Sequence, residues 1–150
     1  MSLLDRTFQI ERGWDLDNQG NYAEPLDINP GDVIPQGTIV ELDPGGLAVL
    51  ANTPDITKDP KKQVWLVQSG SDDYDGDYLA KINGIARFVI AEIDPPCFDQ
   101  TLAYKKDDLL TFKKGLFTPK TAAGDQVIAK VREVLVSGNM KIDYFGYVGP

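Results

Sequence analysis

Six prolines are spread through residues 25–60, and they limit what this stretch can form. They stand at Pro25, Pro30, Pro35, Pro44, Pro54 and Pro60. Because proline fixes φ and has no backbone N–H to donate, a long helix is excluded here. The apolar residues between the prolines fall in two short runs, Gly37–Leu42 and Gly46–Ala51, separated by Asp43-Pro44-Gly45-Gly46. Proline presets the turn angle and glycine supplies a positive φ, so this spacing predicts a β-hairpin.

Short β-type runs separated by turn residues continue to the C-terminus. Gln63–Val67 is apolar on both faces and predicts a central strand, and Tyr78–Ile82 is a shorter candidate. Gly84–Ile93 is apolar on both parities, apart from Arg87 and Glu92, and predicts one long buried strand. Met140–Phe145 alternates apolar and polar residues, the pattern of a half-buried edge strand.

Within Asp107–Tyr147, residues 126–136 fit two structures. Val127, Ala129 and Val131 alternate like a strand, and a change of parity at Val134 and Val136 indicates a bulge. Val127, Val131 and Val134 also fit helical spacing. The excess of β-branched residues favours the strand.

Taken together, the pattern predicts an all-β or β-rich chain with at most one short helix. We expect a compact sandwich-like or barrel-like domain over residues 25–150. Residues 1–24 show no sheet or helix period, and we expect them to form an extended N-terminal arm. In this arm, the apolar and aromatic residues Phe8, Ile10, Trp14 and Tyr22 stand among polar neighbours. They either fold back on the domain or anchor the arm on another subunit, since aromatic residues commonly dominate protein interfaces.

The composition argues against several kinds of chemistry. The 150 residues include no histidine, so the commonest general base and metal ligand is missing. The lone cysteine, Cys97, has no partner for an intrachain disulfide, which fits synthesis in a reducing cytoplasm. A net charge of -8 argues against direct nucleic-acid binding. No apolar run is long enough to span a membrane, and the N-terminus does not read as a secretory signal. We expect no enzymatic activity, cofactor or catalytic residues.

The charge is unevenly distributed along the chain. Residues 1–60 hold eleven acidic and three basic residues, whereas residues 101–150 hold five acidic and eight basic ones. This gradient is either ordinary solvated surface or a basis for electrostatic matching between neighbouring copies. Asp72, Asp73, Asp75 and Asp77 form an acidic loop that fails the EF-hand spacing. This favours a solvated loop with no metal, and the alternative is an adventitious calcium site or a cation site between subunits.

Two segments resemble the head decoration, or capsid cement, proteins of tailed bacteriophages. Gly31–Val40 has a Gly-Asp-apolar entry followed by a glycine turn and a β run. Ala122–Val131 reads A-A-G-D-Q-V-I-A-K-V, and Met140–Phe145 supplies a similar closing run. The resemblance covers about residues 31–51 and 107–147.

The resemblance implies a non-enzymatic virion protein that is made in the host cytoplasm and binds the outside of an icosahedral capsid. Its expected partners are the major capsid protein and further copies of itself, in a homotrimer. An alternative is a carbohydrate- or receptor-binding β module of a tail appendage. In that case the aromatic residues Trp14, Trp65, Tyr74 and Tyr104 would stack on sugar rings.

Overall fold

The computed structural model describes residues 8–13, 23–52, 62–70, 81–86 and 88–146. These residues form eleven strands and one 3-10 turn, and the expectation of a β-rich fold is confirmed. The strands are β1 (Phe8–Gly13), β2 (Ala23–Asp27), β3 (Ile39–Leu42), β4 (Ala48–Leu50), β5 (Trp65–Ser69), β6 (Lys81–Ile85), β7 (Val89–Ile93), β8 (Leu109–Lys113), β9 (Leu116–Pro119), β10 (Ala129–Val134) and β11 (Met140–Tyr144), and the 3-10 turn is η2 (Pro95–Cys97).

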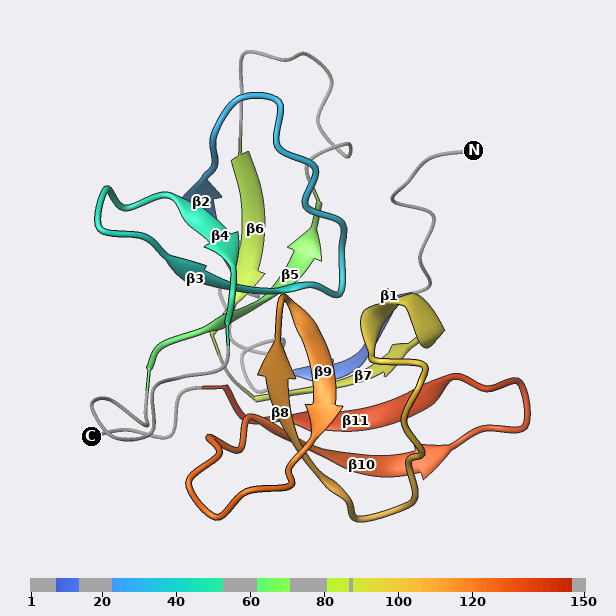
Figure 1. The fold of residues 1–150 in the computed structure, drawn as a ribbon. Helices are drawn as coiled ribbons and strands as arrows, with labels where there is room; N and C mark the ends of the chain where they lie inside the picture. Colours follow the sequence, from blue (N-terminus) through green and yellow to red (C-terminus); the bar gives the residue numbers. More distant parts are fainter. Residues whose placement is uncertain (1–7, 14–22, 53–61, 71–80, 87, 147–150) are drawn as a thin grey trace.

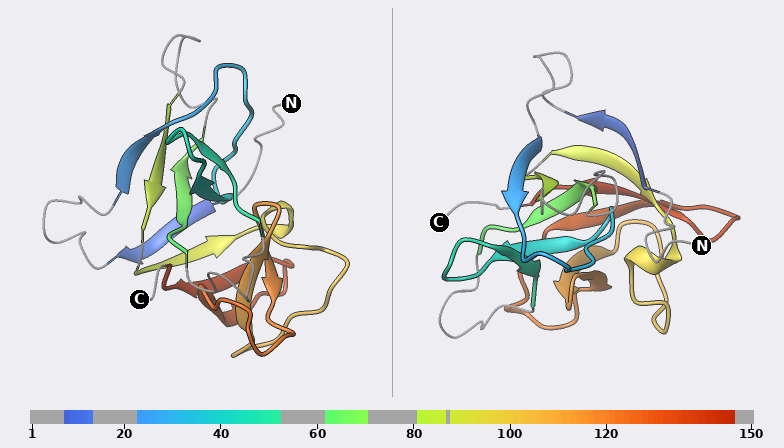
Figure 2. Two further views of the ribbon diagram at one scale, coloured as in Figure 1. Left: turned by 60° about the vertical axis from the view of Figure 1, so that its left-hand side comes forward. Right: turned by 90° about the horizontal axis from the view of Figure 1, so that it is seen from above.

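The strands form two antiparallel sheets. A six-stranded sheet has the order β1-β7-β11-β10-β8-β9, and a five-stranded sheet has the order β2-β6-β5-β3-β4. In Figure 1 the five-stranded sheet is the upper layer and the six-stranded sheet the lower one. Figure 2 shows the same two layers from the side and from above.

The main core lies between the sheets. Side chains from both sheets meet there and are almost fully buried, among them Ile39, Leu66, Ile93, Phe112 and Tyr144. Burying a side chain of this size contributes about 1.5–3 kcal/mol. This shared core therefore holds the two sheets together.

A second, smaller core covers the opposite face of the five-stranded sheet. Val40, Trp65 and Ile82 point to that side and pack with Ile28 and Ile34, which come from the loop after β2. The five-stranded sheet is thus apolar on both faces, which explains why Gln63–Val67 carries no alternation. The expectation of a central strand there is confirmed, because β5 lies between β6 and β3.

Two hairpins, β3–β4 and β8–β9, turn where the sequence places glycine-containing turns. β3 and β4 pair as predicted, and the carboxylate oxygen Oδ1 of Asp43 accepts hydrogen bonds from the backbone N–H groups of Gly45 and Leu47, both at 2.9 Å. β8 and β9 are joined by Lys114 and Gly115. The backbone of Gly115 binds across to the other sheet, since its oxygen accepts from the Ile39 N–H at 2.9 Å and its N–H donates to the Ala51 oxygen at 2.9 Å.

The expected single strand over Gly84–Ile93 is wrong. β6 ends at Ile85 in the five-stranded sheet, and β7 begins at Val89 in the six-stranded sheet. Between them the chain changes sheet, and Phe88 takes a positive φ of 67°. The apolar run looked continuous because both strands supply the same core.

Two expectations about the C-terminal strands have different outcomes. Residues 129–134 form a strand with a register shift between Val131 and Glu133, so the predicted strand and bulge are confirmed. β11 alternates buried and half-buried residues as expected, but it is not an edge strand, because it lies between β7 and β10.

The N-terminal segment is extended but is not a free arm where it is described. Phe8–Gly13 pairs with β7 at the edge of the six-stranded sheet. The expected boundary at residue 24 falls inside β2, which pairs with β6.

Candidate functional site on the β10–β11 face

The outer face of β10 and β11 carries several charged side chains of both signs. Because side chains alternate along a strand, Val131 and Ile142 point into the core while Lys130, Lys141 and Asp143 point outward. The bulge adds Arg132 to this face, since Val131 pairs with Ile142 and Glu133 pairs with Lys141, leaving Arg132 as the extra residue.

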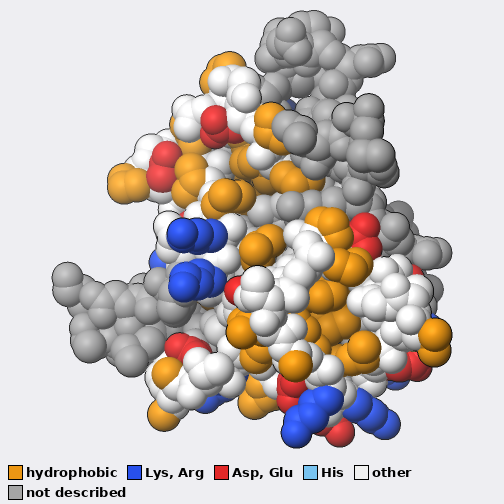
Figure 3. All heavy atoms as spheres, turned by 45° about the vertical axis from the view of Figure 1, so that its right-hand side comes forward, with side chains coloured by type: hydrophobic (Ala, Val, Ile, Leu, Met, Phe, Trp, Pro, Cys, Tyr) orange, Lys and Arg blue, Asp and Glu red, His pale blue; other side chains and the backbone are white. Residues whose placement is uncertain are grey.

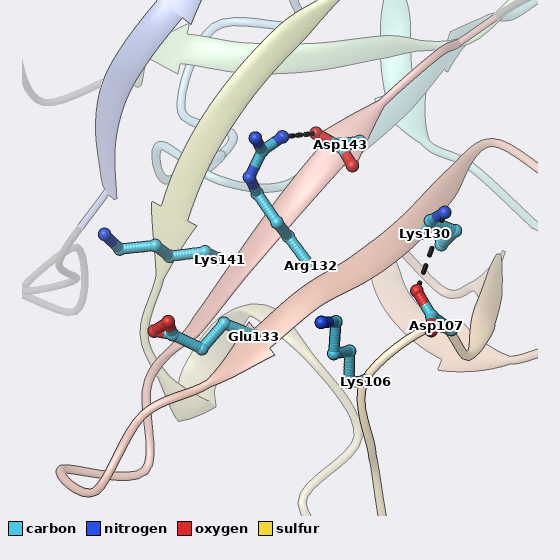
Figure 4. Close-up of a pocket in the computed structure, with 7 residues that line it drawn as sticks. All are labelled: Lys106, Asp107, Lys130, Arg132, Glu133, Lys141 and Asp143. Carbon is cyan, nitrogen blue, oxygen red and sulfur yellow. Dashed lines mark hydrogen bonds and ion pairs between the residues drawn. The ribbon is translucent and has the colours of Figure 1, made fainter.

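These side chains line an open depression of about 470 Å³ (Figure 4). Its lining consists of four basic and three acidic residues: Lys106, Asp107, Lys130, Arg132, Glu133, Lys141 and Asp143. Arg132 donates to Asp143 at 2.8 Å, and Lys130 lies 3.6 Å from Asp107. The first pair joins β10 to β11, and the second ties β10 to the loop before β8 (Figure 4).

Exposed apolar side chains lie near both ends of β10, and one of them, Leu109, shares a face with the depression. Leu109 pairs with Lys130 across β8 and β10 and is 42% exposed. At the opposite end of β10, Val134 is 43% exposed, but it pairs with the buried Met140 and so lies on the core side of the sheet. Val136 in the following turn is fully exposed. On the face that Figure 3 shows, charged side chains of both signs likewise reach the surface beside hydrophobic ones.

This arrangement suits contact with a protein surface better than chemistry on a small molecule. Protein interfaces combine apolar contacts with charged and hydrogen-bonding groups that set the orientation of the partner. The acidic and basic groups here are spread along two strands and a loop. No carboxylate pair is isolated from cations, because Asp107 and Asp143 each lie against a basic group.

The groups with shifted pKa values lie elsewhere. Burial raises the pKa of Tyr144, whose hydroxyl donates to the Val64 carbonyl at 3.3 Å within the main core. Burial also raises the pKa of Tyr104 to about 12, and the nearby charge of Asp99 adds to this effect. A hydrogen bond from the Thr101 side chain lowers the pKa of the exposed Asp99 carboxyl. These groups hold the core and the loop after η2, and none lines the depression.

The four arm residues predicted from sequence are not brought together by the described structure. Phe8 and Ile10 lie in β1, opposite Ile93 and Ala91 of β7. Trp14 and Tyr22 lie outside the described residues, as does the acidic loop with Asp72, Asp73, Asp75 and Asp77.

The aromatic residues of the carbohydrate alternative are not open platforms where they are described. Trp65 is 9% exposed, and its indole N–H donates to the Glu24 carboxylate. Tyr104 is half-buried, stacks edge-on against Phe98, and donates to the Asp99 carbonyl at 2.9 Å. Trp14 and Tyr74 lie outside the described residues.

The β10–β11 face was not predicted from the sequence. The available signal was the excess of basic residues after residue 100. Two pairs of adjacent lysines stand there, Lys105-Lys106 and Lys113-Lys114, and of these four residues only Lys106 lines the depression. Lys113 and Lys114 belong to the β8–β9 hairpin instead.

Comparisons with known proteins identify no family for this chain. No protein-family model, curated protein or solved structure matches it. Among the described residues, no helix is long and apolar enough to cross a membrane. Within the same residues, no group of three or more acidic or cysteine side chains is placed to hold a metal ion.

Proposed function

We propose that this chain is a structural protein that decorates and stabilises the outer surface of an icosahedral phage capsid. It acts by binding and performs no catalysis. Its partners are the major capsid protein and further copies of itself, in a homotrimer, and its place is the virion surface.

The resemblance in sequence supports this proposal through two segments that have similar places in the fold. Gly31–Val40 is a loop that leads into β3, and Ala122–Val131 is a loop that leads into β10, and both strands contribute side chains to the buried core. Each segment is thus an exposed turn attached to a rigid sheet, which is a common way to present a binding surface.

The observation that carries the proposal is the exposure of Leu109 beside a charged depression, on the face that it shares with its cross-strand partner Lys130. Exposed apolar side chains next to charges of both signs suit a partner that is also a folded protein surface. On a capsid many copies bind at once, so a weak contact at each copy gives firm attachment through avidity.

The test compares binding of two variants to capsid shells assembled without this chain. Leu109→Asp places a carboxylate on the proposed contact face, opposite Lys130. We expect shell binding in co-sedimentation to weaken at least about tenfold, which corresponds to 1.4 kcal/mol.

The matched control is Phe88→Asp, which changes a residue that is 41% exposed between β6 and β7, outside both segments that carry the resemblance. It should bind shells like the unmodified chain. If the unmodified chain does not bind shells, the function is wrong. If Leu109→Asp binds unchanged, a different face makes the contact.

A further inference from the structure

The N-terminal part of the chain runs antiparallel beside a single later segment. β1 pairs with β7, with Phe8 opposite Ile93 and Gly13 opposite Val89. β2 pairs with β6, and Ala23 lies opposite Ile85. β6 and β7 follow each other in the chain, and β1 and β2 are the outer edge strands that pair with them, one on each of the two sheets (Figures 1 and 2).

The connection between β1 and β2 is longer than this path requires. Val89 and Ile85, which face its two ends, are only four positions apart. Four residues reach at most about 15 Å, and each partner strand lies about 5 Å further out, so the ends are within about 25 Å. Residues 14–22 provide nine residues, which extend to about 33 Å from end to end. The linker therefore has length to spare.

The edge of β7 needs a partner strand. Its inner side chains Val89, Ala91 and Ile93 are buried in the main core, and its other edge is already paired with β11. Without β1, the outer edge of β7 would present unpaired backbone groups beside that core, which favours pairing with another strand. Among the described strands, β1 is paired with β7 alone.

We propose that β1 is exchanged between copies, so that Phe8–Gly13 of one copy pairs with β7 of a second copy in the same register. The exchanged pairing makes the same backbone hydrogen bonds as the internal one, so its cost in contacts is small. Passing the strand from each copy to the next gives a ring where the rotation between copies closes, and an open chain of copies where it does not. This inference does not depend on a capsid partner, because both strands belong to this chain.

Concentration decides which pairing dominates. A short linker holds β1 near its own β7 at an effective concentration in the millimolar range. In dilute solution each copy therefore pairs with its own β1. Where copies stand side by side at a local concentration similar to this effective concentration, pairing with a neighbour's β1 competes with pairing to the chain's own β1 and connects the copies.

The test uses disulfide formation at a pair of facing positions. Gln9 lies opposite Glu92 in the β1–β7 pair. One chain carries Gln9→Cys and a second chain, with a different tag, carries Glu92→Cys. Cys97 is fully buried and is left in place, and the unmodified chain gives the background. The two variants are mixed, equilibrated over a range from about 10 µM to about 1 mM, which brackets the effective concentration of the linker, and then oxidised.

We expect a disulfide-linked heterodimer whose yield rises at least about tenfold over this range, as mass action requires. The control mixture combines Gln9→Cys with Lys113→Cys, since β8 is separated from β1 by three strands. It should give no more heterodimer than the unmodified chain.

A single chain carrying both Gln9→Cys and Glu92→Cys completes the test. At low concentration it should form an internal disulfide and remain a monomer. If this internal disulfide forms but the mixed chains give only background at the highest concentration, exchange does not occur. If the internal disulfide does not form, the β1–β7 register is wrong and the proposal falls with it.

Discussion

The side-chain amide of Gln126 holds both backbone groups of Lys62, although the two residues are 64 positions apart. Its Oε1 accepts from the Lys62 N–H at 2.8 Å, and its Nε2 donates to the Lys62 oxygen at 2.7 Å. Gln126 is 4% exposed, so little water competes for these bonds. The amide joins the segment just before β5, a strand of the five-stranded sheet, to the segment just before β10, a strand of the six-stranded sheet.

Removing this amide should destabilise the fold more than an ordinary surface change. Gln126→Ala leaves the N–H and oxygen of Lys62 without their partner, and we expect the free energy of unfolding to fall by about 2–3 kcal/mol. Urea denaturation measures the change. Gln100→Ala is the control, because Gln100 is exposed, and it should change stability by less than about 0.5 kcal/mol. Equal effects of the two substitutions would contradict the role of Gln126.

Gly146 should tolerate no side chain. A Cβ atom built there would lie 1.8 Å from the Ala86 carbonyl oxygen, and φ is +71°. Gly138 also has a positive φ, +97°, but a Cβ there meets nothing within 4 Å. We expect Gly138→Ala to cost about 1 kcal/mol from backbone strain alone, and Gly146→Ala to cost clearly more, in thermal and urea unfolding. A smaller loss at Gly146 than at Gly138 would show that the approach to Ala86 is not rigid.

The Asp43 carboxylate should stabilise the β3–β4 turn. Asp43→Ala removes the acceptor of two backbone N–H groups, and we expect a loss of about 1 kcal/mol in the free energy of unfolding. Asp32→Ala removes an equally charged, exposed carboxylate from the neighbouring loop and should be nearly neutral. If both variants lose the same stability, the effect comes from charge and not from the turn.

Alkaline pH should weaken the fold partly through Tyr104. Burial raises the pKa of its hydroxyl to about 12, above the ordinary value of 10.0. The protonated phenol is therefore favoured by folding, and its contribution is complete below pH 10 and is lost as the pH rises toward 12. Burial raises the pKa of Tyr144 as well and acts in the same direction.

Comparing the unmodified chain with Tyr104→Phe isolates the contribution of Tyr104. Urea denaturation between about pH 9 and pH 12 should show a shallower loss of stability in the variant, with the share of Tyr144 remaining. Absorbance of the phenolate follows the ionisation of the tyrosines directly. Parallel curves for the two proteins would mean that Tyr104 ionises normally in the folded chain.

Local chemistry accounts for what the sequence predicts correctly. The Asp43–Gly46 turn and the bulge near Arg132 depend on neighbouring residues, and both could be identified from spacing. The break between Ile85 and Val89 could not be identified from the sequence. The residues on both sides of it are apolar because they pack in the same core, and the positive φ falls on Phe88 instead of on a glycine.

The candidate site was missed for a different reason. The depression requires the register of β10 against β11 and the approach of the loop at Lys106 and Asp107, which are relations between distant parts of the chain. Strand alternation places Lys130 and Arg132 on an outer face, but it does not say which residues face them.

The antiparallel pairing of β1 with β7 gives the edge of the six-stranded sheet a directional mechanical response. Tension that lifts residue 8 away from the sheet breaks the ladder one pair at a time, so a small force suffices. Tension along the strand loads all of its hydrogen bonds together and is resisted far better. Whatever pulls on the N-terminus, its direction and not only its strength decides whether this strand stays in place.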